Sequence, residues 1–221
     1  MIITIDGPAA AGKGTLASSL ARKYKYAYFD TGMVYRAVGL EMYLSGQDLN
    51  SETAAAAVAR SLTFSKMTEL SEHPEFRSQL GGKNASIVSA YPSVRAALLK
   101  MQQDFAAAPV FADGSSALGV VYDGRDTGTV VCPQADVKFF ITASPEVRAE
   151  RRYKEFVAKG MNVTYEDVLA DVKARDERDM NRSAAPMKPA ADAVIFDTSK
   201  LSIKDVFNKA CEVIDAKLAK K

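Results

Sequence analysis

Residues that commonly build metal sites and disulfides are scarce in this chain, which has one histidine, two cysteines and no tryptophan among 221 residues. Cys132 and Cys211 stand far apart without the spacing of a metal site, so we expect two reduced thiols. His73 precedes a proline in a polar stretch, and we expect it to be a solvated side chain. The composition therefore does not favour a metal-centred or disulfide-stapled fold.

Long hydrophobic runs are also absent, and no apolar stretch approaches the ~20 residues that a membrane-spanning helix needs. The first residues carry no basic segment and Asp6 interrupts their apolar run, so they do not resemble a signal peptide. Hydrophobic residues make up 48% of the chain, charged residues 25%, and the formal net charge is only +2. We therefore expect a cytoplasmic globular protein that binds neither membranes nor nucleic acid. As to its partners, we expect a monomer that binds small nucleotides only.

Five short apolar runs, most of them rich in β-branched and aromatic residues, predict buried strands. They cover residues 2–5, 26–29, 119–123, 137–142 and 193–198. Most show little alternation between polar and apolar residues, which is typical of strands covered on both faces of a parallel sheet. Helical patterns lie between them, so the sequence predicts an α/β fold with right-handed crossovers.

The long stretch from about 40 to 118 contains helical patches but few strand signals. Residues 51–62 form an alanine-rich pattern that follows Ser51, a favourable helix N-cap. Residues 92–107 form a second helical pattern with Pro92 in its first turn. The sequence therefore predicts helices here, inserted between the second and third strands.

The first strand runs directly into the segment IDGPAAAGKGT, residues 5–15, which contains the phosphate-binding spacing G-x-x-x-x-G-K. Glycines allow successive backbone N–H groups to point at one concave spot, and the helix that follows adds its positive N-terminal end. Lys13 is expected to bridge phosphate oxygens. Thr15 is the candidate Mg²⁺ ligand; because Gly14 is inserted before it, the ion could instead be held by water molecules alone. The segment predicts ATP binding by Gly7, Ala9, Ala10, Ala11, Gly12, Lys13, Gly14 and Thr15.

Arginines follow two of the predicted strands at their carboxyl ends, where ligands bind in α/β folds. DTGMVYR contains Arg36, YDGRDTGT contains Arg125, and a later segment, ARDERDMNR, contains Arg175 and Arg182. A protein that moves a phosphoryl group between two phosphates needs such cations to offset dense negative charge. A guanine-reading motif is missing because the pair Asn208-Lys209 lacks the following aspartate, which lowers the case for a GTPase switch.

Three segments together, FDTGMVYRAV, YDGRDTGTVVCPQADVKFFITASPEVRAERR and RDERDMNRSAAPMKPAADAVIFDTS, resemble the bacterial cytidylate kinases, which are P-loop nucleoside monophosphate kinases. With the phosphate-binding loop, the resemblance spans nearly the whole chain and is weakest at about 50–82. It implies a five-stranded parallel sheet flanked by helices in one domain, 1–221. The core would cover about 1–35, 83–150 and 170–221, the acceptor-side insert about 36–82, and a short lid about 151–169.

The same resemblance implies reversible transfer of the ATP γ-phosphoryl group to CMP or dCMP with Mg²⁺, and it assigns roles to residues. The acceptor phosphate would be held by Thr31, Arg36, Arg125 and Arg182, with Tyr35 beside them. Asp179 would contact the sugar, and Ser86, Arg95 and Asp126 would read the base. Arg151, Arg152 and Arg175 would form or border the lid. Lys13, Arg125, Arg151 and Arg182 would act in catalysis.

Base recognition by these residues is chemically consistent with cytosine. Asp126 can accept a hydrogen bond from the cytosine amino group at N4, whereas uracil would present an oxygen to the same carboxylate. Arg95 can donate to N3 or O2, so we expect CMP and dCMP to be preferred over UMP. Two alternatives stay open: a kinase for UMP, AMP or shikimate, and an ATP-binding regulator that transfers no phosphate.

One region departs from the resemblance. Many bacterial cytidylate kinases carry a longer acceptor-side insert with several short strands. Residues 62–84 are compact here and do not follow that pattern, so we expect the small sheet to be reduced or missing.

Overall fold

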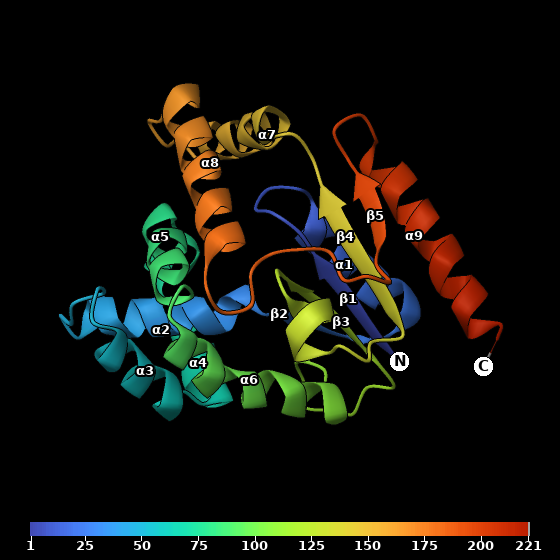
Figure 1. Cartoon of the computed structure of the whole chain (residues 1–221), viewed down its shortest axis with the longest axis horizontal. Helices are drawn as coiled ribbons and strands as arrows, with labels where there is room; N and C mark the ends of the chain where they lie inside the picture. The colour runs from blue at the N-terminus through green and yellow to red at the C-terminus, as the bar shows by residue number, and fades with distance from the viewer. Residues whose placement is uncertain (221) are drawn as a thin grey trace.

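A five-stranded parallel sheet forms the centre of the computed structural model, which describes residues 1–220 (Figure 1). Its strands are β1 (Ile2–Asp6), β2 (Ala27–Asp30), β3 (Val120–Gly124), β4 (Val137–Thr142) and β5 (Val194–Asp197), in the order β2-β3-β1-β4-β5. All neighbouring pairs are parallel. The five strands predicted from the sequence are confirmed. No predicted end differs from the observed one by more than one residue, and both ends of β4 agree.

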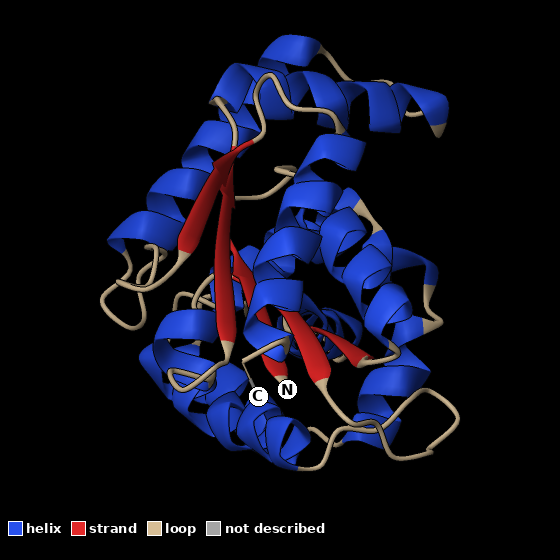
Figure 2. Cartoon of the chain, turned by 90° about the vertical axis from the view of Figure 1, so that its right-hand side faces the viewer, coloured by secondary structure: helices blue, strands red, loops and turns tan. Residues whose placement is uncertain are grey.

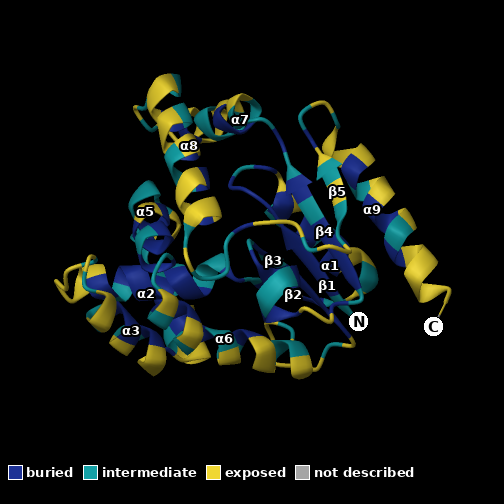
Figure 3. Cartoon of the chain, in the orientation of Figure 1, coloured by how far each residue is buried: buried dark blue, intermediate teal, exposed yellow. Residues whose placement is uncertain are grey.

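Helices cover both faces of the sheet (Figure 2). On one face, α1 (Lys13–Tyr24) and α9 (Ile203–Leu218) pack over Ile3, Ile5 and Phe139. On the other face, α2 (Gly32–Leu44) and α6 (Pro92–Ala107) pack over the strand residues Phe29, Val120 and Tyr122. Because β1 and β3 are covered on both sides, their residues are buried without alternation (Figure 3), as the sequence predicts for a parallel sheet.

The segment between β2 and β3 is a helical arm. It consists of α2, α3 (Glu52–Ser61), α4 (Phe64–Ser71), the short 3₁₀ helix η1 (Pro74–Arg77), α5 (Gln79–Val88) and α6. Ser51 caps α3 by accepting a hydrogen bond from the N–H of Ala54, and Pro92 stands in the first turn of α6, both as predicted. The small sheet expected to be reduced has no strand at all in the described residues 62–84, where the fully buried Phe76 supplies an apolar anchor.

His73 differs from its prediction as a solvated side chain. It is half-buried, and its Nδ1 accepts a hydrogen bond from the N–H of Glu75 at 3.2 Å, which caps η1. A short-range side-chain contact of this kind replaces the missing partner of a helix N–H group. The two cysteines are both free and buried. No described helix combines the length and the apolar character needed to cross a membrane.

Two helices rise above the carboxyl end of β4 (Figure 1). They are α7 (Pro145–Ala158) and α8 (Tyr165–Asn181), and the turn between them contains Gly160 at φ +73°. They pack on each other through a separate cluster of Ala149, Phe156, Val168 and Val172. The predicted lid, 151–169, therefore corresponds to part of a longer helical pair that has its own small core.

We expect Phe76→Ala to lower the free energy of unfolding by about 3–5 kcal/mol, because the ring is fully buried and its removal leaves a cavity in the helical arm. Urea denaturation followed by circular dichroism measures the change. Leu118→Ala is the control, since Leu118 is 92% exposed and its removal should change stability by less than about 0.5 kcal/mol. Equal losses in the two variants would contradict the buried position of Phe76.

Candidate active site

A cavity of about 570 Å³ opens at the carboxyl ends of the strands, between the sheet, the helical arm and the pair α7–α8. This is where α/β sheets bind ligands, at the point where connections from the central strand diverge to opposite sides. Here β1 has β3 on one side and β4 on the other. Every site residue predicted from the sequence lines this cavity except Gly7 and Ser86.

The phosphate-binding loop between β1 and α1 has the backbone that the glycine pattern predicts. Gly7 has φ +139°, and a Cβ there would lie 1.9 Å from the carbonyl oxygen of Ile141, so only glycine fits. Gly12 has φ +93° and Ala10 has φ +60°, a left-handed conformation that costs an alanine about 1 kcal/mol. The first turn of α1 contains no acidic residue, so the positive end of this helix is left to a ligand.

Lys13 is buried at the base of the loop, with only 5% of its side chain exposed. Its Nζ donates to the carbonyl of Pro8 at 2.9 Å and lies 3.8 Å from a carboxylate oxygen of Asp123. Burial, followed by the positive charge of Arg125, lowers the pKa of Lys13 to about 8. Burial raises the pKa of Asp123 to about 6, although the neighbouring Lys13 opposes that rise. The charge of this lysine is thus poorly stabilised until an anion approaches.

Asp6, the last residue of β1, holds the turn that follows β3. Its carboxylate accepts hydrogen bonds from the N–H of Thr127 at 2.8 Å, the hydroxyl of Thr127 at 2.7 Å and the N–H of Gly128 at 2.8 Å. Burial raises the pKa of Asp6, while these bonds favour its ionised form. The turn η2 (Thr127–Val131) is thereby fixed directly after Asp126, which stabilises the positions of Arg125 and Asp126 at the cavity wall.

Arginines from three parts of the chain face the loop across the cavity. Arg36 on α2 donates to the carbonyl of Phe76 at 2.8 Å, and Arg125 after β3 donates to Asp179 at 3.0 Å and to the carbonyl of Gly124 at 3.0 Å. Arg182, at the end of α8, donates to the carbonyl of Ala185 at 2.7 Å. Backbone carbonyl oxygens hold all three side chains, and the carboxylates of Asp126 and Asp179 offset part of the charge of Arg125 and Arg182.

Some N–H donors of these buried guanidinium groups are left without a hydrogen-bond partner. The Nε of Arg175 is buried and has no hydrogen-bond partner, and burial followed by the charge of Arg125 lowers its pKa. The Nη2 of Arg182 also lacks a hydrogen bond and has only an ion-pair contact of 3.5 Å with Asp126. Buried donors in native proteins normally have partners, so their presence at a cavity indicates an anionic ligand.

A second group of side chains lies beside the arginines. Arg95 on α6 pairs with Asp126 at 2.5 Å, donates to the carbonyl of Ser89 at 3.1 Å, and places its guanidinium 5.3 Å from the ring centre of Tyr35. Ser86 lies apart from this group: its hydroxyl accepts from Nε of Arg178 at 3.1 Å, and it does not line the cavity. Of the three predicted base-reading residues, the structure brings together Arg95 and Asp126 only.

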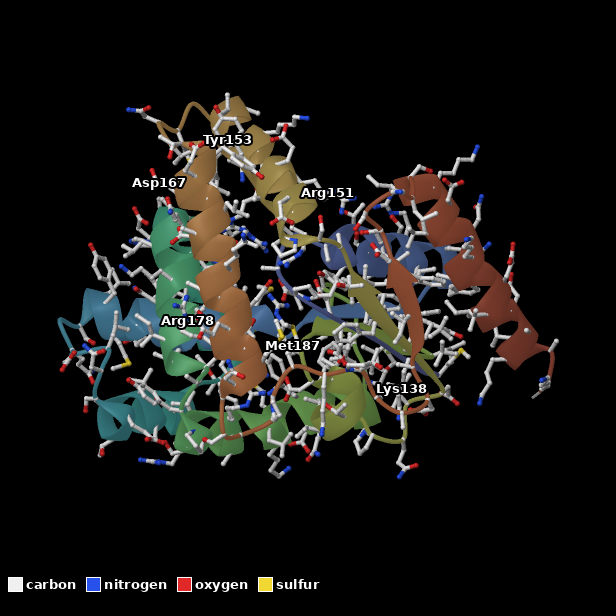
Figure 4. All side chains as sticks on the ribbon, turned by 45° about the horizontal axis from the view of Figure 1, so that its top comes forward. Lys138, Arg151, Tyr153, Asp167, Arg178 and Met187 are labelled. Atoms are coloured by element: carbon white, nitrogen blue, oxygen red, sulfur yellow. The ribbon has the colours of Figure 1, made fainter. Side chains whose placement is uncertain are left out.

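The predicted lid arginines lie on α7 and α8. Arg151, labelled on α7 in Figure 4, donates to the carbonyl of Thr198 at 2.6 Å and to its hydroxyl at 3.1 Å. The same hydroxyl can donate its one proton either to the carbonyl of Ala11 in the phosphate-binding loop at 3.2 Å or to the carbonyl of Thr142 at 3.1 Å. Arg152 stacks over the ring of Phe156 at 4.8 Å. Arg151 is therefore linked to the donor loop through Thr198.

Sequence reasoning missed several residues that line the cavity. Asp30 and Asp123 stand in the segments FDTGMVYRAV and YDGRDTGT but received no role in the site. They pair in register near the carboxyl ends of adjacent strands, which was a signal for such a role. Thr198 and Ser89 also line the cavity. Thr198 stands in the third segment of the resemblance and Ser89 lies between Ser86 and Arg95, but neither received a role. Arg148, which contacts the phosphate-binding loop from α7, stands in the second segment of the resemblance but received no role there.

A loop that cradles phosphate, set opposite a cluster of incompletely paired arginines in one cavity of a parallel α/β sheet, is the arrangement of a P-loop kinase. Comparison with known proteins narrows this class. The family described as cytidylate kinase matches residues 3–216, and the chain belongs to that family.

Curated relatives span the same length. A cytidylate kinase of Rhodopseudomonas palustris is 50% identical over 216 residues, covering 98% of this chain and 96% of that protein. A cytidylate kinase of Rhodospirillum rubrum is 48% identical over 220 residues, covering 100% of both chains. Among solved structures, an uncharacterized protein of Eubacterium ventriosum matches with a TM-score of 0.52 and 12% identity, covering 98% of each chain, which shows a shared fold alone.

We expect ATP binding to take up a proton at about pH 8.5. The pKa of Lys13 is about 8, so most of the lysine is neutral there without ligand, and a bound triphosphate restores its charge. Calorimetry in buffers of different ionisation enthalpy should give an uptake of roughly 0.7 proton at pH 8.5 and roughly 0.1 at pH 7. In Lys13→Met, the extra proton uptake at pH 8.5 relative to pH 7 should disappear. If that extra uptake stays unchanged, the proton is taken up by another group.

Proposed function

We propose that this chain transfers the γ-phosphoryl group of ATP to CMP or dCMP, giving ADP and CDP or dCDP, in pyrimidine nucleotide metabolism. The observation that carries the proposal is the single cavity in which the phosphate-binding loop faces incompletely paired arginines. Membership of the cytidylate kinase family and the full-length relatives of that name support it. A regulator that only binds ATP has no need of this second cationic site.

The reaction requires two polyanions to approach each other. The loop N–H groups, the N-terminus of α1 and Lys13 would hold the β- and γ-phosphates of ATP, while Arg36, Arg125 and Arg182 would hold the acceptor phosphate. An oxygen of the acceptor phosphate forms a bond to the γ-phosphorus, and the bond from that phosphorus to the bridging oxygen breaks as ADP leaves. The attacking oxygen is already ionised, so no side chain need act as a base.

Mg²⁺ is the expected cofactor, and the residues present fit it. Thr15 is exposed at the cavity and offers a hydroxyl, while Asp30 and Asp123 offer carboxylates at the same end of the sheet. In the described residues, no group of three or more histidine, cysteine, aspartate or glutamate side chains could hold a metal. That fits an ion which binds largely through water and substrate phosphates. The ion would neutralise phosphate charge and orient the donor.

Water competes with the acceptor phosphate, so a kinase must exclude it during transfer. The pair α7–α8 contributes Arg151, Arg152 and Arg175 to the cavity and has its own apolar cluster, so it can move as a unit. Within it, the turn at Gly160 would let α7 and α8 adjust. We propose that this pair, which includes the predicted lid 151–169, closes over bound ATP as the helical arm closes over the acceptor.

The paired Arg95 and Asp126 support cytosine as the preferred base. Asp126 retains lone pairs beyond those used by Arg95 and Arg182, so its carboxylate can accept from the N4 amino group. Uracil places an acceptor oxygen there, and each buried polar group left unpaired costs about 1–3 kcal/mol. We also propose that the chain acts in the cytoplasm, as a monomer, on free nucleotides.

A coupled assay of ADP release tests the activity directly. With ATP and Mg²⁺ present, we expect CMP and dCMP to be turned over with kcat/KM at least ~10-fold above UMP, because one mispaired carboxylate costs about 1–3 kcal/mol. GMP should also be turned over poorly, since guanine presents the acceptor oxygen O6 where cytosine presents an amino group. AMP is the stricter comparison, because its N6 amino group and N1 repeat part of the cytosine pattern. If UMP, AMP or shikimate were turned over faster than CMP, that compound would replace CMP as the proposed acceptor. If ADP release did not depend on any acceptor, the chain would instead be an ATP-binding regulator.

Replacing Arg182 separates acceptor binding from donor binding. Its buried guanidinium would form charge-assisted bonds to the acceptor phosphate, so Arg182→Ala should lower kcat/KM for CMP by about 100-fold. Its ATP dissociation constant should stay within about twofold, because Arg182 would contact the acceptor side only. Arg60→Ala is the control, since Arg60 is exposed and lies outside the cavity. Normal CMP turnover by Arg182→Ala would show that the acceptor phosphate binds elsewhere.

A further inference from the structure

Arg148, in the second turn of α7, is almost completely buried and joins three separate parts of the chain. Its Nε donates to the carbonyl of Ala143 at 2.9 Å, just after β4. Its Nη1 donates to the carbonyl of Ala9 in the phosphate-binding loop at 3.2 Å. Nη1 and Nη2 together donate to both carboxylate oxygens of Asp176 on α8. One guanidinium group therefore contacts the end of β4, the donor loop and α8 at once.

Neither member of this pair lines the cavity. Arg148 is 2% exposed and Asp176 is 5% exposed. The carboxylate of Asp176 pairs with Arg148 alone among the described residues. Because neither side chain reaches the cavity, the pair cannot touch a bound substrate. Any influence on the site must act through the contacts of Arg148 with the loop and with α8.

On the loop side, Arg148 fixes one peptide group. The carbonyl and the N–H of a trans peptide point in opposite directions, so holding the Ala9 carbonyl toward Arg148 turns the N–H of Ala10 the other way. Ala9 and Ala10 both line the cavity, whereas Arg148 approaches the loop from outside it. Ala10 is also the loop residue with a left-handed backbone that does not suit alanine, and such a conformation persists only where the surroundings impose it.

On the helix side, the pair fixes the orientation of α8 around its own axis. Asp176 lies between Arg175 and Asp179, which both face the cavity. A bidentate contact between a guanidinium and a carboxylate constrains direction as well as distance. A rotation of α8 that displaced Arg175 and Asp179 would therefore break the contact of Asp176 with Arg148.

We propose that Arg148 is a positioning residue that couples the donor-phosphate loop to α8, so that the two phosphate sites form as one unit. The consequence rests on the proposed function: ATP affinity depends on a residue of α8 that touches neither substrate. A purely structural pair would stabilise the fold and leave ATP affinity unchanged.

Asp176→Asn tests this coupling because it changes α8 without changing the loop. Asparagine has one acceptor oxygen in place of two and directs N–H donors at the guanidinium, so the orientation of Arg148 is lost. We expect the dissociation constant of ATP, titrated without any acceptor, to rise three- to tenfold. The matched control is Glu146→Gln, which breaks an exposed ion pair of 3.3 Å between α7 and α8, with Lys173, and should leave ATP binding unchanged.

Arg148→Lys provides a second variant in case Asp176→Asn does not fold. It keeps the buried positive charge but cannot reach Ala143, Ala9 and Asp176 together, and it should weaken ATP binding by a similar factor. If the ATP dissociation constant of the variant that folds rises less than threefold, the proposal is overturned, whatever happens to the melting temperature. An equal rise in Glu146→Gln would also overturn it. Because the titration omits the acceptor, it is independent of which monophosphate is phosphorylated, whereas failure of the wild-type chain to bind ATP would reject the proposed function itself.

Discussion

Positive charge that is held in place but only partly compensated is the constraint on which the rest of this structure depends. Lys13, Arg36, Arg125 and Arg182 each donate to a backbone carbonyl, which satisfies an N–H group without adding negative charge. The nearby carboxylates of Asp123, Asp126 and Asp179 offset part of this charge. In a poorly solvated cavity, neighbouring cations repel one another strongly. Buried charges of this kind do not maximise the stability of the fold. They indicate that the cationic side chains of the cavity repel one another until an anionic ligand binds between them.

Much of this architecture could be predicted from local sequence. The strands are continuous apolar runs, and the phosphate-binding loop is a contiguous motif whose glycines have a direct geometric purpose at Gly7 and Gly12. Ser51 and Pro92 mark helix starts through interactions within a few residues. The arginines were found because parallel strands bring their carboxyl ends to one edge, which makes Arg36 and Arg125 neighbours despite their separation in the chain.

The remainder depends on contacts that no local pattern encodes. Arg148 meets Ala9 across 139 positions, and Lys13 meets Asp123 across 110 positions, so neither contact has a spacing that could be recognised. Ser86 was placed by resemblance beside the base, but the hydroxyl accepts from Arg178 on α8, a helix remote in sequence. His73 appeared to be an ordinary polar residue because its capping role depends on the turn at Pro74. Side-chain pairing of this sort follows from the assembled fold.

The hydrogen bond from Arg36 to the carbonyl of Phe76 has a consequence for how this scaffold can diversify. The acceptor is a main-chain oxygen, so its availability depends on the path of the backbone through η1, which the buried Phe76 ring and the close approach of Gly81 to this carbonyl help to fix. Insertions, deletions or exchanged segments in the helical arm can therefore be accommodated while the arginine keeps its orientation, provided that one carbonyl returns to the same point. Variation in length between about 62 and 84 is then compatible with an unchanged phosphate pocket, which makes this arm a practical position for grafting new acceptor-binding segments.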